Sequence, residues 1–288
     1  MFTVHYRVSN SAQKTSPPTN LVFMLLGTSA IVLAWQLACW AGSPVAPISP
    51  GAVGRVENSL SIPAGTVLPV RLEREISVKE AQRGQEIAGK IMQDVPLPGN
   101  DKIPMKSTVR GAILSVEKDD DGSGVKVTLQ FDQFEIRKET LKISSYLRAI
   151  ASFRAVRSAQ IPRTGADGGT PAGWGDTMQI GGDVRYGDGG PVVNHAKQKI
   201  GKGVNGGVLI HLSANPASGC DGPVSGDNPL QALWVFSADA CGVYDLQGVK
   251  LVHVGKGAPA GEITLHFEKD DMKLEAGTGM LLRVAPQS

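Results

Sequence analysis

Ile62 to Leu72 reads Ile-Pro-Ala-Gly-Thr-Val-Leu-Pro-Val-Arg-Leu, a small-residue turn followed by an alternating apolar run. Glycine allows such a turn because it adopts positive φ without a Cβ clash. The apolar alternation indicates a half-buried strand. The unit recurs at Ala276 to Val284 with the same Ala-Gly-Thr and Arg spacing, and more loosely at Ile103 to Gly111. Turn-then-strand units at both ends predict an all-β fold, a single β-barrel or β-sandwich-like domain whose first and last strands are neighbours.

The clearest strand begins at Val125, where apolar residues alternate with polar ones as far as Asp132. It follows three adjacent carboxylates and two glycines in the segment Asp119–Gly124. Three carboxylates suggest calcium, but the alternating ligand spacing and the distal Glu of an EF-hand loop are absent. A hairpin turn with a solvated acidic tip is the favoured interpretation. In all, the sequence predicts about ten strands, among them residues 66–73, 86–96, 107–118 and 232–238.

The N-terminal region predicts export. No charged side chain occurs from Thr15 to Gly54, and this stretch is long enough to span a bilayer. Arg7 and Lys14 precede it, which predicts a cytoplasmic N-terminus. A cleaved secretory signal is the alternative. The expected division is a cytoplasmic segment at 1–20, a signal peptide or membrane anchor helix at 21–42, a Pro-rich linker at 43–59 and a barrel domain at 60–288. The protein is therefore expected in the cell envelope, anchored in the inner membrane facing the periplasm or secreted after cleavage.

The net charge of the chain gives little indication of a charged partner. The chain has 29 Lys and Arg against 27 Asp and Glu, and removing residues 1–42 leaves 27 of each sign. We therefore expect no nucleic-acid partner. A modest basic cluster suggests either a polyanion site or a solvated strand end, and the second is favoured because one aromatic residue is little for base stacking. This cluster comprises Arg148, Arg154, Arg157 and Arg163.

Residues 164–207 differ from the rest of the chain because 14 of these 44 residues are Gly and apolar periodicity is lost. Such a segment buries too little surface to offset its ordering entropy. We expect a flexible, disordered insertion in the barrel domain. Gly201–Gly206 fits G-x-G-x-x-G, but the strand and helix of a dinucleotide-binding unit do not flank it, so a chance match is favoured.

Cys220 and Cys241 are predicted to form a disulfide, because an even pair of cysteines in an oxidising compartment is more often bridged than metal-bound. Free buried thiols are the alternative. His211, His253 and His266 lie in strand-like runs and could converge on one barrel face, but no zinc-ligand spacing occurs. Isolated histidines with ordinary hydrogen bonds are favoured. We expect neither a metal nor a cofactor.

No motif for catalysis is present. The chain has no G-x-S-x-G elbow, and its carboxylates cluster at turns without pairing on one strand face. The sequence therefore favours a protein that is not an enzyme. Three aromatic residues are candidate ligand contacts as stacking platforms, although the last also suits a core position. These residues are Trp174, Tyr186 and Trp234.

The three turn-then-strand units together resemble the framework of the periplasmic β-barrel domain of TrbI-like proteins from type IV secretion systems. The I-x-A-G-T strand is matched by Ile62, Ala64, Gly65 and Thr66. The I-P-x-G-S strand is matched by Ile103, Pro104 and Ser107, with Lys106 where Gly is usual, and the closing strand by Gly277 to Val284. The resemblance implies one membrane helix and an exported barrel. The family's long tether and apolar helical insertion have no counterpart here, and its pattern includes no cysteine pair.

Two functions follow as hypotheses. The first is a non-enzymatic cell-envelope barrel that acts as an interaction or assembly module, with envelope proteins or further copies as partners and the membrane reached through the N-terminal helix. The alternative is a secreted ligand-binding domain, for example a carbohydrate binder. A hydrolase with an active site assembled from loops is a third, less favoured reading.

Overall fold

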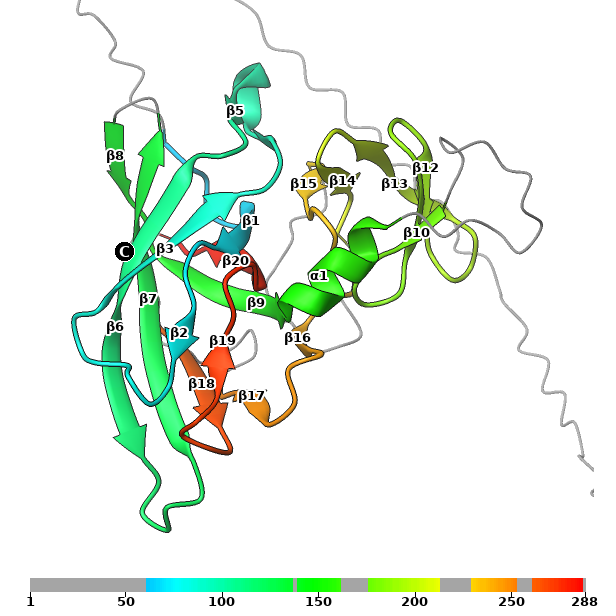
Figure 1. Cartoon of the computed structure of the whole chain (residues 1–288). Coiled ribbons are helices and arrows are strands. Elements are labelled where there is room, and N and C mark those ends of the chain that lie inside the picture. Colours follow the sequence, from blue (N-terminus) through cyan, green and yellow to red (C-terminus); the bar gives the residue numbers. More distant parts are fainter. Residues whose placement is uncertain (1–60, 137–138, 162–175, 213–228, 253–260, 287–288) are drawn as a thin grey trace, which may run out of the picture. The chain divides into compact units, whose positions relative to one another are not determined.

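The computed structural model describes residues 61–136, 139–161, 176–212, 229–252 and 261–286. The chain divides into two units, Met1–Glu57 and Asn58–Ser288, and all described residues belong to the second. The predicted segments 1–20, 21–42 and 43–59 lie outside them. The described part is mostly β, as predicted (Figure 1). None of its helices is both long and apolar enough to cross a membrane.

Ten strands of the described chain form one sheet. Its order is β16-β9-β20-β1-β3-β6-β7-β18-β17. Strand β8 pairs with the C-terminal end of β7, beyond the part that pairs with β18. All pairings are antiparallel except β16 with β9. The strands are β1 (Val67–Leu72), β3 (Glu86–Ile91), β6 (Thr108–Lys118), β7 (Val125–Ile136), β8 (Glu139–Lys142), β9 (Ser145–Ala151), β16 (Gly242–Tyr244), β17 (Val249–Leu251), β18 (Ile263–Phe267) and β20 (Gly279–Val284).

In chain order, the first strand of this sheet is β1 and the last is β20. These two strands pair with each other, which confirms the prediction. Val67 on β1 lies opposite Arg283 on β20, and the register continues to Arg71 opposite Gly279. The turn before β1 is tied to the end of β20, because the Gly65 amide donates to the Val284 carbonyl at 2.8 Å. The predicted hairpin is also present between β6 and β7 (Figure 1), where the Asp119 amide donates to the Gly124 carbonyl at 3.0 Å.

The predicted barrel is wrong, because the large sheet of the described residues does not close. Its edge strands, β16 and β17, follow each other in the chain across Asp245–Gly248, and their Cα atoms come within 8 Å. No ladder joins them within the described ranges. Each has only three residues, and Asp245 between them has φ 52°. The tight turn leaves little length for cross-strand hydrogen bonds.

A second sheet of six strands has the order β10-β11-β12-β13-β14-β15 in the described chain. The prediction of a disordered insertion was therefore wrong for residues 176–207, while 164–175 lie outside the described residues. Gly203 and Gly207 show the physical reason: a Cβ at Gly203 would lie 2.3 Å from the Gly187 carbonyl oxygen, and one at Gly207 would lie 2.5 Å from Trp234 Cα. Glycine here permits close backbone packing. The strands are β10 (Asp176–Met178), β11 (Val184–Tyr186), β12 (Pro191–Val193), β13 (Lys199–Val204), β14 (Gly207–Ile210) and β15 (Gln231–Ala232).

Two hydrophobic cores lie on opposite faces of β9, β20 and β1. On β20, Met280 and Leu282 enter the first core, whereas Leu281 enters the second. The second core also contains residues of the six-stranded sheet and of the helix α1 (Phe153–Gln160), which buries Val156 and Ala159. The remaining short elements are β2 (Ile76–Ser77) paired with β19 (Lys273–Leu274), β4 (Val95–Pro96) paired with β5 (Lys102–Ile103), and the 3-10 turn η1 (Pro98–Asn100).

Candidate functional site

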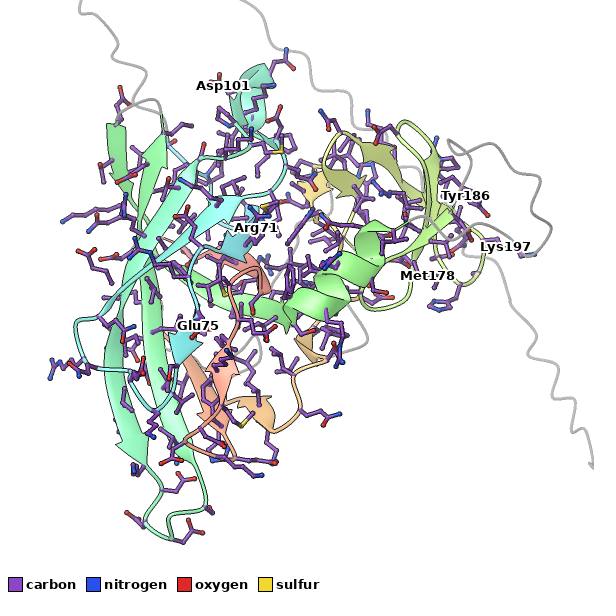
Figure 2. All side chains as sticks on the ribbon, viewed as in Figure 1. Arg71, Glu75, Asp101, Met178, Tyr186 and Lys197 are labelled. Atoms are coloured by element: carbon purple, nitrogen blue, oxygen red, sulfur yellow. The ribbon has the colours of Figure 1, made fainter. Side chains whose placement is uncertain are left out.

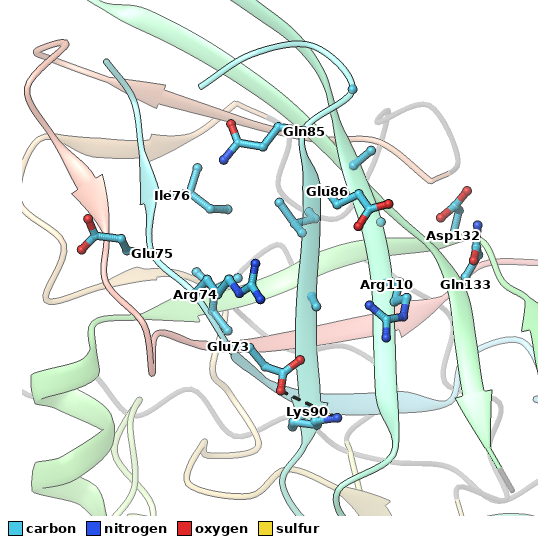
Figure 3. A pocket seen from close by; sticks show the side chains of 16 residues that line it. Glu73, Arg74, Glu75, Ile76, Gln85, Glu86, Lys90, Arg110, Asp132 and Gln133 are labelled. Carbon is cyan, nitrogen blue, oxygen red and sulfur yellow. Dashed lines mark ion pairs between the residues drawn. The ribbon is translucent and has the colours of Figure 1, made fainter. Parts of the chain in front are cut away.

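An open groove of about 870 Å³ lies over the outer face of β3 and β6 (Figure 3). The segment Glu73–Ile76, which leads from β1 into β2, forms one rim. Strand β7 contributes Asp132 and Gln133 on the other side. We call this hollow the β3–β6 groove.

Strand alternation places the charged side chains of the groove. On β3, Ile87 and Ile91 point into the first core, so Glu86, Ala88 and Lys90 point outward. Ala88 lies opposite Arg110 of β6, and Arg110 lies opposite Gln133 of β7. Outward side chains of three neighbouring strands therefore form rows across the groove floor.

Ion pairs fix the positions of some of the charged side chains in the groove. Arg110 Nε lies 2.6 Å from Glu135 Oε1, and the hydrogen bond from Arg110 holds the pKa of Glu135 below its ordinary value. Lys90 Nζ donates to Thr108 Oγ1 at 2.6 Å and lies 3.7 Å from Glu73 Oε1 (Figure 3). Both signs of charge thus face solvent in fixed positions.

The side chains that line the groove limit its chemistry. They include carboxylates, guanidinium and ammonium groups and amides, but no His, Cys, Ser, Thr or aromatic residue. The described part of the chain also holds no group of three or more His, Cys, Asp or Glu residues placed to bind a metal ion. The groove therefore offers charged hydrogen-bonding groups for recognition.

Of the aromatic residues predicted as ligand contacts, the two described ones do not share a surface. Tyr186 lies on β11 (Figure 2) and is 45% exposed. Trp234 is only 2% exposed and packs in the second core, so the prediction of a ligand contact there was wrong. The expected strand at 232–238 ends at Ala232, because the chain turns at Trp234 with φ 53°. Trp174 lies outside the described residues.

The predicted cysteine pair is described at one end only. Cys241 is in a disulfide, and its amide donates to the Tyr244 hydroxyl at 2.9 Å. Cys220 lies outside the described residues, so the pairing of these two cysteines stays a prediction.

The acidic hairpin tip is held by side chains of neighbouring strands. Asp119 lies 2.6 Å from Lys126 Nζ and 2.7 Å from His266 Nε2, and the Lys126 hydrogen bond is the main reason that the pKa of Asp119 is lowered. Asp121 accepts from the Ser123 amide at 2.9 Å. His266 thus has an ordinary hydrogen bond, and His253 lies outside the described residues. The favoured solvated hairpin tip agrees with these contacts.

The four predicted basic residues do not form one cluster. Arg148 is buried on β9 and donates to the carbonyl oxygens of Ala238 and Ala240, at 2.8 and 3.0 Å. Arg154 pairs with Asp245 at 3.0 Å, whereas Arg157 lies over the Phe153 ring. Arg163 lies outside the described residues. One arginine therefore fastens the backbone of 238–240, and two belong to the surface of α1.

Sequence reasoning missed Gln93, which links the two sheets. Its side chain is fully buried, donates to the Val208 carbonyl at 2.9 Å and accepts from the Trp234 amide. It also missed the groove charges. Their signal was present, because Glu86, Lys90 and Arg110 occupy outward positions of predicted strands. Gln93 carries no such signal, since one amide beside a strand looks like a surface residue.

No protein-family model, curated protein or solved structure was found to match this chain.

Proposed function

We propose that this chain is a non-enzymatic interaction module of the cell envelope, and that the β3–β6 groove takes an extended, charged segment of another envelope protein. The domain would face the periplasm from a membrane anchor, or would act there after signal cleavage. Its likeness in three short motifs to TrbI-like domains supports an assembly role for the proposed module.

The lining of the groove carries this proposal. An open, polar hollow with charges of both signs suits a polypeptide that supplies complementary charges. Arg74 and Glu86 line the groove without an ion-pair partner among the described residues. These two side chains are available to a bound segment, whereas Arg110 and Lys90 are held by their own neighbours.

The experiment is site-specific photo-crosslinking in cells that express the full chain. A photoreactive residue at Gln133, which is exposed in the groove, is compared with one at Lys197, which is exposed between β12 and β13. We expect a specific protein adduct from the groove position only. Glu86→Lys should reduce that adduct, and Glu268→Lys, a charge reversal outside the groove, should not.

Three outcomes would count against the proposal. Equal adducts from both positions would indicate non-specific capture, and no adduct from Gln133 would leave the groove without a protein partner. An adduct with a second copy of the chain would replace the foreign partner by self-association.

Carbohydrate binding remains a second candidate because Tyr186 is a large exposed aromatic side chain on the second sheet. Stacking on an exposed ring is a common way to hold a sugar. A glycan array with the wild type and Tyr186→Ala tests this function. Signals that survive the substitution, or a blank array, would remove Tyr186 as a sugar platform.

A further inference from the structure

Helix α1 has two dissimilar faces. Its inner face buries Val156 and Ala159 in the second core. At about 100° per residue, positions 153, 154, 157, 158 and 161 form a contiguous arc away from this buried face. The residues of this arc line a shallow hollow of about 380 Å³. We call them the α1 outer face: Phe153, Arg154, Arg157, Ser158 and Ile161.

The α1 outer face is unusual in exposing two large apolar side chains. Phe153 is 37% exposed and Ile161 is 60% exposed. Only four large apolar side chains are exposed in the described part of the chain, and the other two are Tyr186 and Val252. A surface helix normally places polar residues opposite its buried stripe. Two apolar side chains on one small face therefore indicate a contact surface.

The charge of this face is positive and lies next to the apolar side chains. The Arg157 guanidinium lies 5.6 Å from the centroid of the Phe153 ring, and no carboxylate of the described residues forms an ion pair with it. Arg154 is offset by Asp245, and Glu275 also acts on it electrostatically. Arg157 is thus the cation available to an anionic partner, flanked by Phe153 and Ile161.

We propose that the α1 outer face is a contact site for an anionic lipid surface. Phe153 and Ile161 would enter the boundary between headgroups and acyl chains, and Arg157 would bind a lipid phosphate. This inference rests on the membrane anchor of the proposed function and does not rest on the groove.

The length of chain before the described residues favours lipid over a protein partner. Residues 43–60 separate the predicted membrane segment from the first described residue, and fully extended they reach only about 60 Å. An anchored domain therefore stays close to the bilayer. A contact of two apolar side chains and one arginine is weak for a free domain, but tethering gives it a high effective concentration.

The test uses the full chain with nanodiscs of phosphatidylcholine, with or without phosphatidylglycerol, and both kinds of disc contain a photoactivatable phosphatidylcholine analogue. Lipid adducts are mapped by mass spectrometry. We expect adducts within 153–161 that require the anionic lipid. Arg157→Glu should reduce them about five-fold or more, given the contribution of one basic residue near such a surface.

Further variants separate lipid contact from damage to the fold. Phe153→Ser with Ile161→Ser should also remove the adducts, whereas Tyr186→Ser with Val252→Ser, the matched exposed apolar pair, should not. Arg157→Lys keeps the charge and should retain most of the signal. Unchanged thermal unfolding of Arg157→Glu shows that its loss of adducts is not a folding defect.

Several results would overturn the proposal. Adducts within 153–161 that are equal in neutral and anionic discs would remove the role of Arg157. An absence of adducts there, or adducts that both α1 variants leave intact, would remove the site altogether. Glu86→Lys in the groove should leave the lipid adducts unchanged, so failure of the groove proposal and failure of this one can be told apart.

Discussion

Strands β9, β20 and β1 are covered on both faces, whereas β3, β6 and β7 of the same sheet keep one face in water. All six residues of β20 are buried, while β3 alternates buried residues with more exposed ones. In β9, β20 and β1, neighbouring residues such as Met280 and Leu281 pack in different cores. One sheet thus has a structural half and a half that presents charged side chains. The following predictions test this division, beginning with the largest expected effect.

Leu281→Ala should strongly destabilise the doubly covered half. The Leu281 side chain is fully buried in the second core, and truncating such a residue costs about 2–5 kcal/mol of unfolding free energy. Urea unfolding of the two proteins measures the difference. A loss below about 1 kcal/mol would mean that this face of β20 is not packed as described.

Gln93→Leu should weaken the link between the two sheets. The change leaves the Val208 carbonyl and the Trp234 amide without their buried partner, and each unsatisfied group costs about 1–3 kcal/mol. Hydrogen exchange of the Val208 and Trp234 regions, compared with β3 and β6, locates the effect. Uniform protection in both regions would contradict a linking role. Gln133→Leu, at an exposed amide of β7, is the matched control.

Asp183→Asn should change how stability depends on pH. Burial raises the pKa of Asp183, whose Oδ2 accepts from the Ala238 amide at 2.7 Å. Since the folded-state pKa lies above the unfolded value, this residue reduces the unfolding free energy as pH rises through the unfolded and then the folded pKa. The asparagine variant, which keeps an acceptor oxygen, should therefore gain stability over the wild type between acidic and neutral pH.

Unfolding curves across that pH range measure the gain, and Asp188→Asn on the β11–β12 connection provides the control. A constant difference between variant and wild type at every pH would show that Asp183 has the same pKa in both states.

The smallest effect is expected in the half with one face in water. Arg110 of the groove floor pairs with Glu135 of β7 on this exposed face, where solvent and salt screen charges. A double-mutant cycle with Arg110→Ala and Glu135→Ala should give a small coupling that decreases as salt is added. A large coupling that resists salt would show that the groove floor is shielded from water.

The same division explains what the sequence could predict. The half with one face in water shows simple alternation, so β6, the hairpin and β7 were predicted close to their observed bounds. The pairing of β1 with β20 followed from their shared Ala-Gly-Thr turn. The packing of a second core against β9 and β20 was missed. The continuous apolar runs Ala149–Ala151 and Met280–Leu282 are nevertheless typical of strands buried on both faces.

The other errors concern glycine and tryptophan. The glycines of 176–207 were interpreted by their entropy, but several of them lie where no side chain fits against a neighbouring backbone. Close approach of backbones depends on tertiary partners, and the local sequence does not reveal these partners. Trp234 was kept as a candidate ligand contact although a core position was favoured, and its burial depends on α1 and β20, which lie far from it in sequence.

The position of β20 between β9 and β1 has a consequence for biogenesis. The hydrogen bonds that β1 and β9 make to β20 can form only when Gly279–Val284 is in place between them. Pairing over so long a sequence separation is slow, and unpaired strand edges are prone to aggregation. Until β20 is in place, β1 and β9 each present one unpaired edge, and a chain lacking Gly279–Val284 would carry two such edges in the middle of its main sheet.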